Sequence, residues 1–172
     1  ADIATFDRDS MVVRETTHRR SPLSINREVP GFRPQVLLSS LGLAYLAWST
    51  PRDQEEILRA IAASDRSDAP LARDREWVRA RLAEVRRRGY GFREGGISEK
   101  TGSIGVPVMW RGKPLAAINI HYILSALTME QVVDRYLEDM RAAARKIEEM
   151  LALRAQPALA DDVGPRLRSE PD

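Results

Sequence analysis

The chain has 172 residues, with 27 basic and 25 acidic side chains and a formal net charge of +2. This length suits one domain with its own core, and the small net charge argues against duplex DNA as a direct partner of this chain. The absence of cysteine excludes disulfides, thiol catalysis and cysteine-bound zinc. No apolar run is long enough to span a membrane and no signal peptide opens the chain, so we expect a cytoplasmic protein.

Alternating apolar residues predict strands near the start of the chain, at residues 2–6, 11–17 and 23–29. Pro30-Gly31 then breaks the pattern, and Ser39-Ser40 precedes a helix expected over residues 41–48. Either serine can cap that helix by accepting hydrogen bonds from the free N–H groups of its first turn.

Two helices should follow, separated by a loop over residues 64–70. The first begins at Thr50-Pro51, because threonine caps well and proline costs nothing at the first helical position. The second covers residues 74–88, and Gly89 ends it. The longest helix begins at Thr128 and extends to about residue 152.

Between these helices, the stretch Gly102–His121 has the pattern of two strands joined by a tight turn, with a short strand before it at residues 90–92. Gly112 can supply the positive φ that a short hairpin needs. Pro107 lacks an N–H group, so its strand should be an edge strand or bulged. Polar residues on the two arms point either to solvent or into a pocket: Ser103, Asn119 and His121.

The order of these elements predicts an α+β fold, with one antiparallel sheet of about six strands and helices packed on its faces. Residues 1–155 should form this domain. Residues 156–172 are rich in proline and charge and lack periodicity, so we expect a flexible tail there.

The sequence carries no motif for catalysis. Its two histidines, His18 and His121, are not part of any zinc, P-loop, nucleophile-elbow or dinucleotide motif. We therefore expect no enzyme, no cofactor and no metal. Two alternatives stay open: a serine hydrolase whose residues meet only in space, and a metal site built from both histidines and a carboxylate.

Binding of an organic anion has more support. The Ser39-Ser40 turn precedes a helix, whose free N–H groups and dipole can receive a carboxylate, although the pattern alone favours simple capping. Arg27, Arg33 and Arg93 can each pair with an organic acid or lie at the surface.

Four segments in this order resemble the effector-binding domain of the IclR family of bacterial transcription regulators: Ser40-x-Gly42-x-Ala44-x-Leu46-Ala47, Val85-Arg86-x-x-Gly89-Tyr90, Ile104-x-Val106-Pro107-Val108 and Leu115-Ala116-Ala117-Ile118. The likeness covers residues 2–151. It implies a GAF- or profilin-like fold, with an N-terminal winged helix-turn-helix that this chain lacks. Residues 17–24 and 39–42 are most similar to activators of 3-(3-hydroxyphenyl)propionate catabolism, which implies an aromatic, phenylpropanoid-like acid as effector.

The resemblance also implies the positions of the effector site, between the sheet and the helices. These positions are Ser40, Leu41, Arg93, Thr101, Ser103, Asn119 and His121, with Met109, Leu37 and Leu41 as an apolar wall. The lining differs from that of family members that bind small oxo-acids. The usual Ser-Gly-x-Gly-Lys turn is Ser39-Ser40-Leu41-Gly42-Leu43 here, Arg93 replaces an acidic residue, and Asn119 and His121 replace small, serine-like residues.

From this resemblance we expect a regulatory domain that binds a small organic acid, assembles as a homodimer or tetramer, and acts on DNA through the missing N-terminal domain. A sensor domain of a signalling protein and a small hydrolase remain the alternatives.

Overall fold

The computed structural model describes residues 1–17, 30–95 and 100–155. Two strands come first, then four helices, three more strands and a long final helix. The strands are β1 (Asp2–Asp7), β2 (Ser10–Thr16), β3 (Gly91–Glu94), β4 (Thr101–Trp110) and β5 (Lys113–Ile123). The helices are α1 (Ser40–Trp48), α2 (Pro51–Ala62), α3 (Ala69–Arg73), α4 (Arg75–Arg88) and α5 (Met129–Arg154). Of these helices, none is both long and apolar enough to cross a membrane.

All five strands form one antiparallel sheet in the order β2-β1-β5-β4-β3. The predicted α+β class with a single antiparallel sheet is therefore confirmed. The sixth expected strand, at residues 23–29, falls outside the described residues. Because β1 pairs with both β2 and β5, the first and last strands of the chain lie side by side within the sheet.

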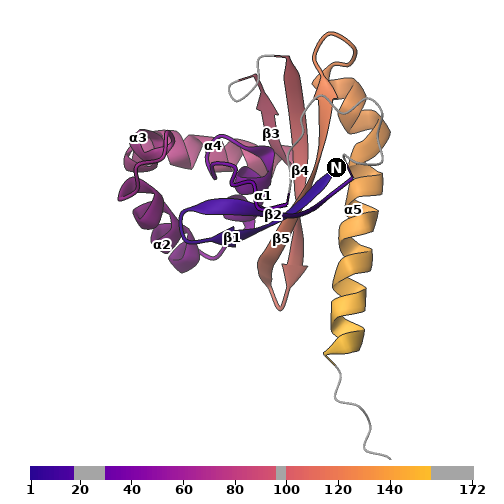
Figure 1. Ribbon diagram of the computed structural model, residues 1–172, viewed down its shortest axis with the longest axis horizontal. Coiled ribbons are helices and arrows are strands. Elements are labelled where there is room, and N and C mark those ends of the chain that lie inside the picture. Colours follow the sequence, from indigo (N-terminus) through magenta and orange to yellow (C-terminus); the bar gives the residue numbers. More distant parts are fainter. Residues whose placement is uncertain (18–29, 96–99, 156–172) are drawn as a thin grey trace, which may run out of the picture.

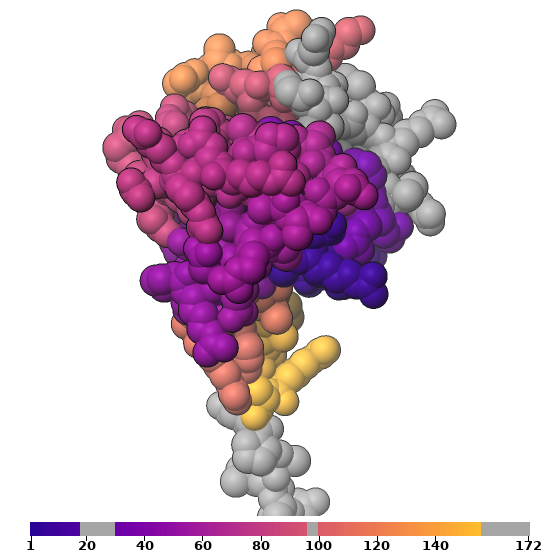
Figure 2. Space-filling view, turned by 90° about the vertical axis from the view of Figure 1, so that its left-hand side faces the viewer, coloured from indigo at the N-terminus to yellow at the C-terminus, as the bar shows by residue number. Residues whose placement is uncertain are grey.

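The helices cover both faces of the sheet. α1 to α4 lie on one face and α5 runs along the other (Figure 1). Figure 2 looks onto the α1–α4 side, where these helices lie in front of the strands. Buried apolar side chains from both helical layers and from the sheet form the main core, among them Leu46, Val85, Ile104, Val106 and Leu137.

The caps predicted at Thr50 and Thr128 are confirmed, and Asp74, which was expected inside a helix, caps α4 instead. The side chains of Thr50, Asp74 and Thr128 each accept a hydrogen bond from an N–H group in the first turn of α2, α4 and α5. Gly89 ends α4 with a φ of 79°. The loop predicted over residues 64–70 was too long. Its last two residues begin the short helix α3, where proline in the first turn loses no hydrogen bond.

The strand β4 becomes an edge strand where the shorter β3 ends. β3 pairs only with residues 102–105 of β4. Further along, Pro107 has no N–H group, the N–H of Met109 donates a 2.6 Å hydrogen bond to Glu148 of α5, and the register shifts between Val108 and Met109. The prediction that Pro107 lies on an edge or bulged strand is therefore confirmed, and this edge offers few free donors to another chain.

Candidate functional site

The first turn of α1 lies directly on the sheet, because two glycines leave room for it. A Cβ atom at Gly91 would be 2.3 Å from the carbonyl oxygen of Ser40, and one at Gly105 would be 2.7 Å from it. Ser39 is the N-cap of α1, and its side chain accepts a 3.1 Å hydrogen bond from the N–H of Gly42. The Ser39-Ser40 turn therefore begins a helix, as predicted, and faces the strands β3 and β4.

Two backbone donors of this turn are available. Within the described residues, the N–H groups of Ser40 and Leu41 donate no hydrogen bond. The Ser40 hydroxyl instead donates to the hydroxyl of Ser103 at 2.9 Å, and both side chains are buried. Free N–H groups at a helix N-terminus favour a carboxylate.

Strand pairing aligns the polar site residues in two rows across the sheet. Ser103 of β4 pairs with Arg93 of β3 and with His121 of β5. One step along, Asn119 of β5 pairs with Gly105 of β4 and with Asp2 of β1. Residues directly opposite each other on neighbouring strands share one face, and the contacts of Ser103 and Gly105 with Ser40 show that this face is the one covered by α1.

The predicted residues meet around one small cavity. Its lining consists of Pro34, Ser39, Leu41, Arg93, Ser103, Asn119 and His121, so it includes five of the seven predicted positions. The remaining two lie next to it: Ser40 bonds to Ser103, and Thr101 accepts hydrogen bonds of 2.9 and 3.0 Å from Arg93. The cavity volume is about 10 Å³, which is room for about one water molecule. An organic acid therefore fits here only if the first turn of α1 or a lining side chain moves.

Several other candidates lie elsewhere. Of the three residues expected to form the apolar wall, only Leu41 lines the cavity. Leu37 belongs to the main core, and Met109 lies near the hairpin end of β4. Arg33 forms a 2.8 Å ion pair with Asp7. His18 and Arg27 fall outside the described residues.

His121 has two competing neighbours inside the site. Its Nε2 lies 3.0 Å from Oδ2 of Asp2 and 3.1 Å from Nδ2 of Asn119. One nitrogen cannot donate to the carboxylate and accept from the amide at once. The charge-assisted bond is the stronger, so we assign the Nε2 proton to the bond with Asp2. The Asn119 amide then keeps an N–H group for an acceptor in the cavity.

The Asp2 carboxylate is stabilised in its charged form. Burial alone would raise its pKa, but hydrogen bonds from His121 and Thr16 outweigh burial and hold the pKa of Asp2 below its ordinary value. The Thr16 hydroxyl donates to Asp2 at 2.7 Å, and the Asp2 side chain is fully buried. The sequence patterns did not reveal Asp2 as part of the site, because the pairing of β1 with β5 is not visible in either strand alone.

The polar groups of the site bond to one another: the Ser103 hydroxyl accepts a 2.9 Å hydrogen bond from the Ser40 hydroxyl, and the Nε2 of His121 bonds to Asp2. The described part of the chain also contains no cluster of three or more potential metal ligands from histidine, aspartate and glutamate.

A larger cavity lies on the opposite face of the sheet, between α5 and the strands β1 and β5. Its volume is about 390 Å³, and its walls are mainly apolar, with Ile3, Ile118, Ile120, Tyr136, Met140 and Ile147 among them. The ionisable residues that line this cavity are acidic (Asp2, Glu15 and Asp139), and none of the described residues lining it is lysine or arginine. These features suit an apolar contact better than an organic anion.

Several solved structures that are similar to this chain are those of transcription regulators. The regulator RHA06195 from Rhodococcus sp. RHA1 matches with a TM-score of 0.71 and 18% identity, over 89% of this chain and 62% of that one. An IclR homolog from Microbacterium hydrocarbonoxydans, complexed with 4-hydroxybenzoate, matches with a TM-score of 0.63 and 25% identity, over 88% of this chain and 60% of that one. The inducer-binding domain of PobR from Acinetobacter, a double mutant in complex with 3-hydroxybenzoic acid, matches with a TM-score of 0.66 and 20% identity. The match covers 86% of this chain and 85% of that one. This chain thus spans about three fifths of the length of the first two.

The family follows from the sequence match. Residues 1–149 match the family described as bacterial transcriptional regulator IclR C-terminal. The chain belongs to this family, so the resemblance drawn from the four sequence segments is confirmed.

Proposed function

We propose that this chain senses a small organic acid, aromatic and phenylpropanoid-like, at the cavity below α1. The observation that carries the proposal is the set of donors around that cavity: the N–H groups of Ser40 and Leu41, the amide of Asn119, and the charged guanidinium of Arg93, which already donates to Thr101 and to the carbonyl of Gly95. A carboxylate that leaves water must regain several hydrogen bonds, preferably from charged or backbone donors. These four groups can supply them.

The aromatic part of the ligand is inferred from the remaining lining. Pro34 and Leu41 offer apolar surface, and His121 offers a partner for a phenol. Two structures with this fold carry hydroxybenzoates in their names, which supports the same class of ligand. The arginine at position 93, where oxo-acid binders carry an acidic residue, further favours a different ligand from theirs.

We further propose that the ligand changes transcription of catabolic genes. The DNA contact would come from a winged helix-turn-helix in a part of the protein outside this chain, as expected for a cytoplasmic regulator of this family. With its net charge of +2, the chain itself should not bind duplex DNA specifically.

Assembly into a dimer or tetramer is part of the same proposal. The apolar cavity between α5 and the strands β1 and β5 is the contact surface we favour. Tyr136 at its rim is 42% exposed, which is unusual for a large aromatic side chain next to an apolar groove.

Titration calorimetry tests the ligand proposal. The chain should bind 3-(3-hydroxyphenyl)propionate or 4-hydroxybenzoate more tightly than pyruvate, which lacks the ring. Ser103→Val and His121→Leu should each weaken this binding about tenfold, because each removes a polar group from the cavity.

Ser125→Val is the matched control, because Ser125 is exposed in the turn after β5. It should leave the affinity unchanged, and the melting temperature of each variant reports whether it is folded. The proposal fails if no aromatic acid binds the folded chain, or if both cavity variants bind as tightly as the unchanged protein.

A further inference from the structure

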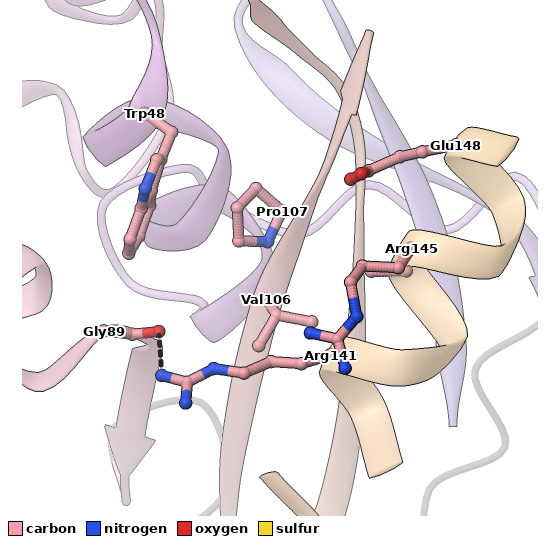
Figure 3. A pocket seen from close by; sticks show the side chains of 8 residues that line it. Trp48, Gly89, Val106, Pro107, Arg141, Arg145 and Glu148 are labelled. Atoms are coloured by element: carbon pink, nitrogen blue, oxygen red, sulfur yellow. Dashed lines mark hydrogen bonds between the residues drawn. The ribbon is translucent and has the colours of Figure 1, made fainter. Parts of the chain in front are cut away.

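A third cavity lies at the free edge of β4, beside Trp48 at the C-terminal end of α1 (Figure 3). Its volume is about 260 Å³, just below the range of about 300–1,000 Å³ that is usual for small-molecule pockets. It shares no lining residue with the cavity below the first turn of α1. We call it the β4-edge pocket, and its lining consists of Trp48, Gly89, Val106, Pro107, Arg141, Ala144, Arg145 and Glu148.

Two guanidinium groups reach from α5 into the β4-edge pocket. Arg141 forms a 2.6 Å ion pair with Glu138 and donates a 3.2 Å hydrogen bond to the carbonyl of Gly89. Arg145, one turn further along α5, has no ion pair or hydrogen bond with any described residue. Like charges four residues apart destabilise a helix, so an anion between these two arginines would relieve their repulsion.

The only acidic side chain in this lining is already engaged. Oε1 of Glu148 accepts the 2.6 Å hydrogen bond from the N–H of Met109, at the edge of β4. Figure 3 shows its carboxylate apart from the guanidinium of Arg145, which instead points toward Val106 and Arg141. Among the described residues, Glu148 therefore forms no ion pair with Arg145, and the guanidinium of Arg145 stays available to an anion.

The opposite wall of the β4-edge pocket is apolar and partly aromatic. The indole of Trp48 extends from the end of α1, and the ring of Pro107 lies between it and α5 (Figure 3). Aromatic rings stack on indole and on guanidinium planes, and a guanidinium binds a carboxylate with two parallel hydrogen bonds. A small acid with one flat ring matches both walls.

We infer that the β4-edge pocket is a second ligand site, which takes a small aromatic carboxylate with its acid group on Arg145 and its ring against Trp48. This site does not depend on the proposed effector site. Because α1 carries Trp48 at one end and Ser40 at the other, both sites contact the same short helix.

Nuclear magnetic resonance of the 172-residue chain tests this inference with benzoate as the probe. The indole N–H signal of Trp48, assigned with Trp48→Phe, should shift saturably as benzoate is added. Acetate, which lacks the ring, should bind at least about tenfold more weakly. Arg145→Gln should weaken benzoate binding about tenfold.

Arg135→Gln is the matched control, since Arg135 is exposed on the same helix and does not line the β4-edge pocket. It should bind benzoate unchanged at equal ionic strength. His121→Leu separates the two sites, because the Trp48 shift should persist in that variant whether or not the effector proposal holds. The inference is overturned if the Trp48 signal does not move, if Arg145→Gln responds like the unchanged chain, if acetate binds as well as benzoate, or if His121→Leu abolishes the shift.

Discussion

The Nε2 of His121 lies 3.0 Å from Oδ2 of Asp2, although the two residues are 119 positions apart in the chain. This contact joins β1 to β5 at the candidate effector site. Thr16 extends it to β2 through its 2.7 Å hydrogen bond to the other oxygen of Asp2. Three strands thus meet at one carboxylate.

Stability should depend on pH through Asp2. Its pKa is lower in the folded chain than in the unfolded chain, so Asp2 stabilises the fold above its unfolded pKa of about 3.9, and this contribution is lost as the pH falls through the folded value. Asp2→Asn should lower the free energy of unfolding by about 1–3 kcal/mol near neutral pH. The difference from the unchanged chain should shrink between about pH 5 and about pH 3.

Urea unfolding followed by circular dichroism across this pH range measures the difference. Asp65→Asn is the control, because Asp65 is exposed, and it should change stability by less than about 0.5 kcal/mol at every pH. A cost of Asp2→Asn that does not vary with pH would contradict the assigned role of the carboxylate.

The buried serine pair should behave as a coupled unit. Ser40 and Ser103 are 0% and 1% exposed, so Ser103→Ala leaves the Ser40 hydroxyl without its partner and should cost about 1–3 kcal/mol. The double variant Ser40→Ala/Ser103→Ala should lose less than the sum of the two single variants, with a coupling of at least about 0.5 kcal/mol. Denaturant unfolding of the four proteins decides this, and additive losses would show that the two hydroxyls are not energetically coupled.

Local sequence predicted the parts of the fold that depend on near neighbours. Caps such as Thr50 and Thr128 act within one turn of a helix, and the hairpin around Gly112 needs only alternation and a residue that allows positive φ. Contacts between distant segments could not be predicted in this way. The Asp2–His121 contact and the hydrogen bond from Met109 at the β4 edge to Glu148 leave no pattern in the nearby sequence. Each depends on the order of the strands and on where α5 packs.

The candidate site likewise combines residues that could be predicted from the sequence with contacts that could not. Its polar residues were selected by resemblance to a family, and strand register then brought Ser103 and His121 opposite each other. Pro34 and Ser39 also line the cavity and are not among the predicted site residues, although the Ser39-Ser40 turn is predicted as a place that can receive a carboxylate. The β4-edge pocket was not predicted, since its lining comes from α1, β4, α5 and the turn after α4, which meet only in the folded chain.

Close approach of α1 to the sheet should make Gly105 sensitive to substitution. The Cβ atom of Gly105→Ala would be 2.7 Å from the Ser40 carbonyl oxygen. Backbone must shift to relieve this clash, so the free energy of unfolding should fall by about 1–3 kcal/mol. Gly112→Asn is the control, because a Cβ there meets no atom within 4 Å and asparagine tolerates the φ of 79°. Thermal unfolding compares the two, and equal stability of Gly105→Ala and the unchanged chain would contradict the contact.

Self-association should depend on the apolar groove beside α5. Tyr136→Lys places a charge at the rim of the groove, where a second copy of the chain would have to bury it, so the dimer should dissociate at concentrations at least about tenfold higher than for the unchanged chain. Phe32→Lys is the control, because Phe32 is 38% exposed but does not line the groove. Sedimentation over a range of concentrations measures both variants. If Tyr136→Lys associates like the unchanged chain while Phe32→Lys does not, the contact lies elsewhere on the molecule, and a monomer at every concentration would reject assembly through this chain altogether.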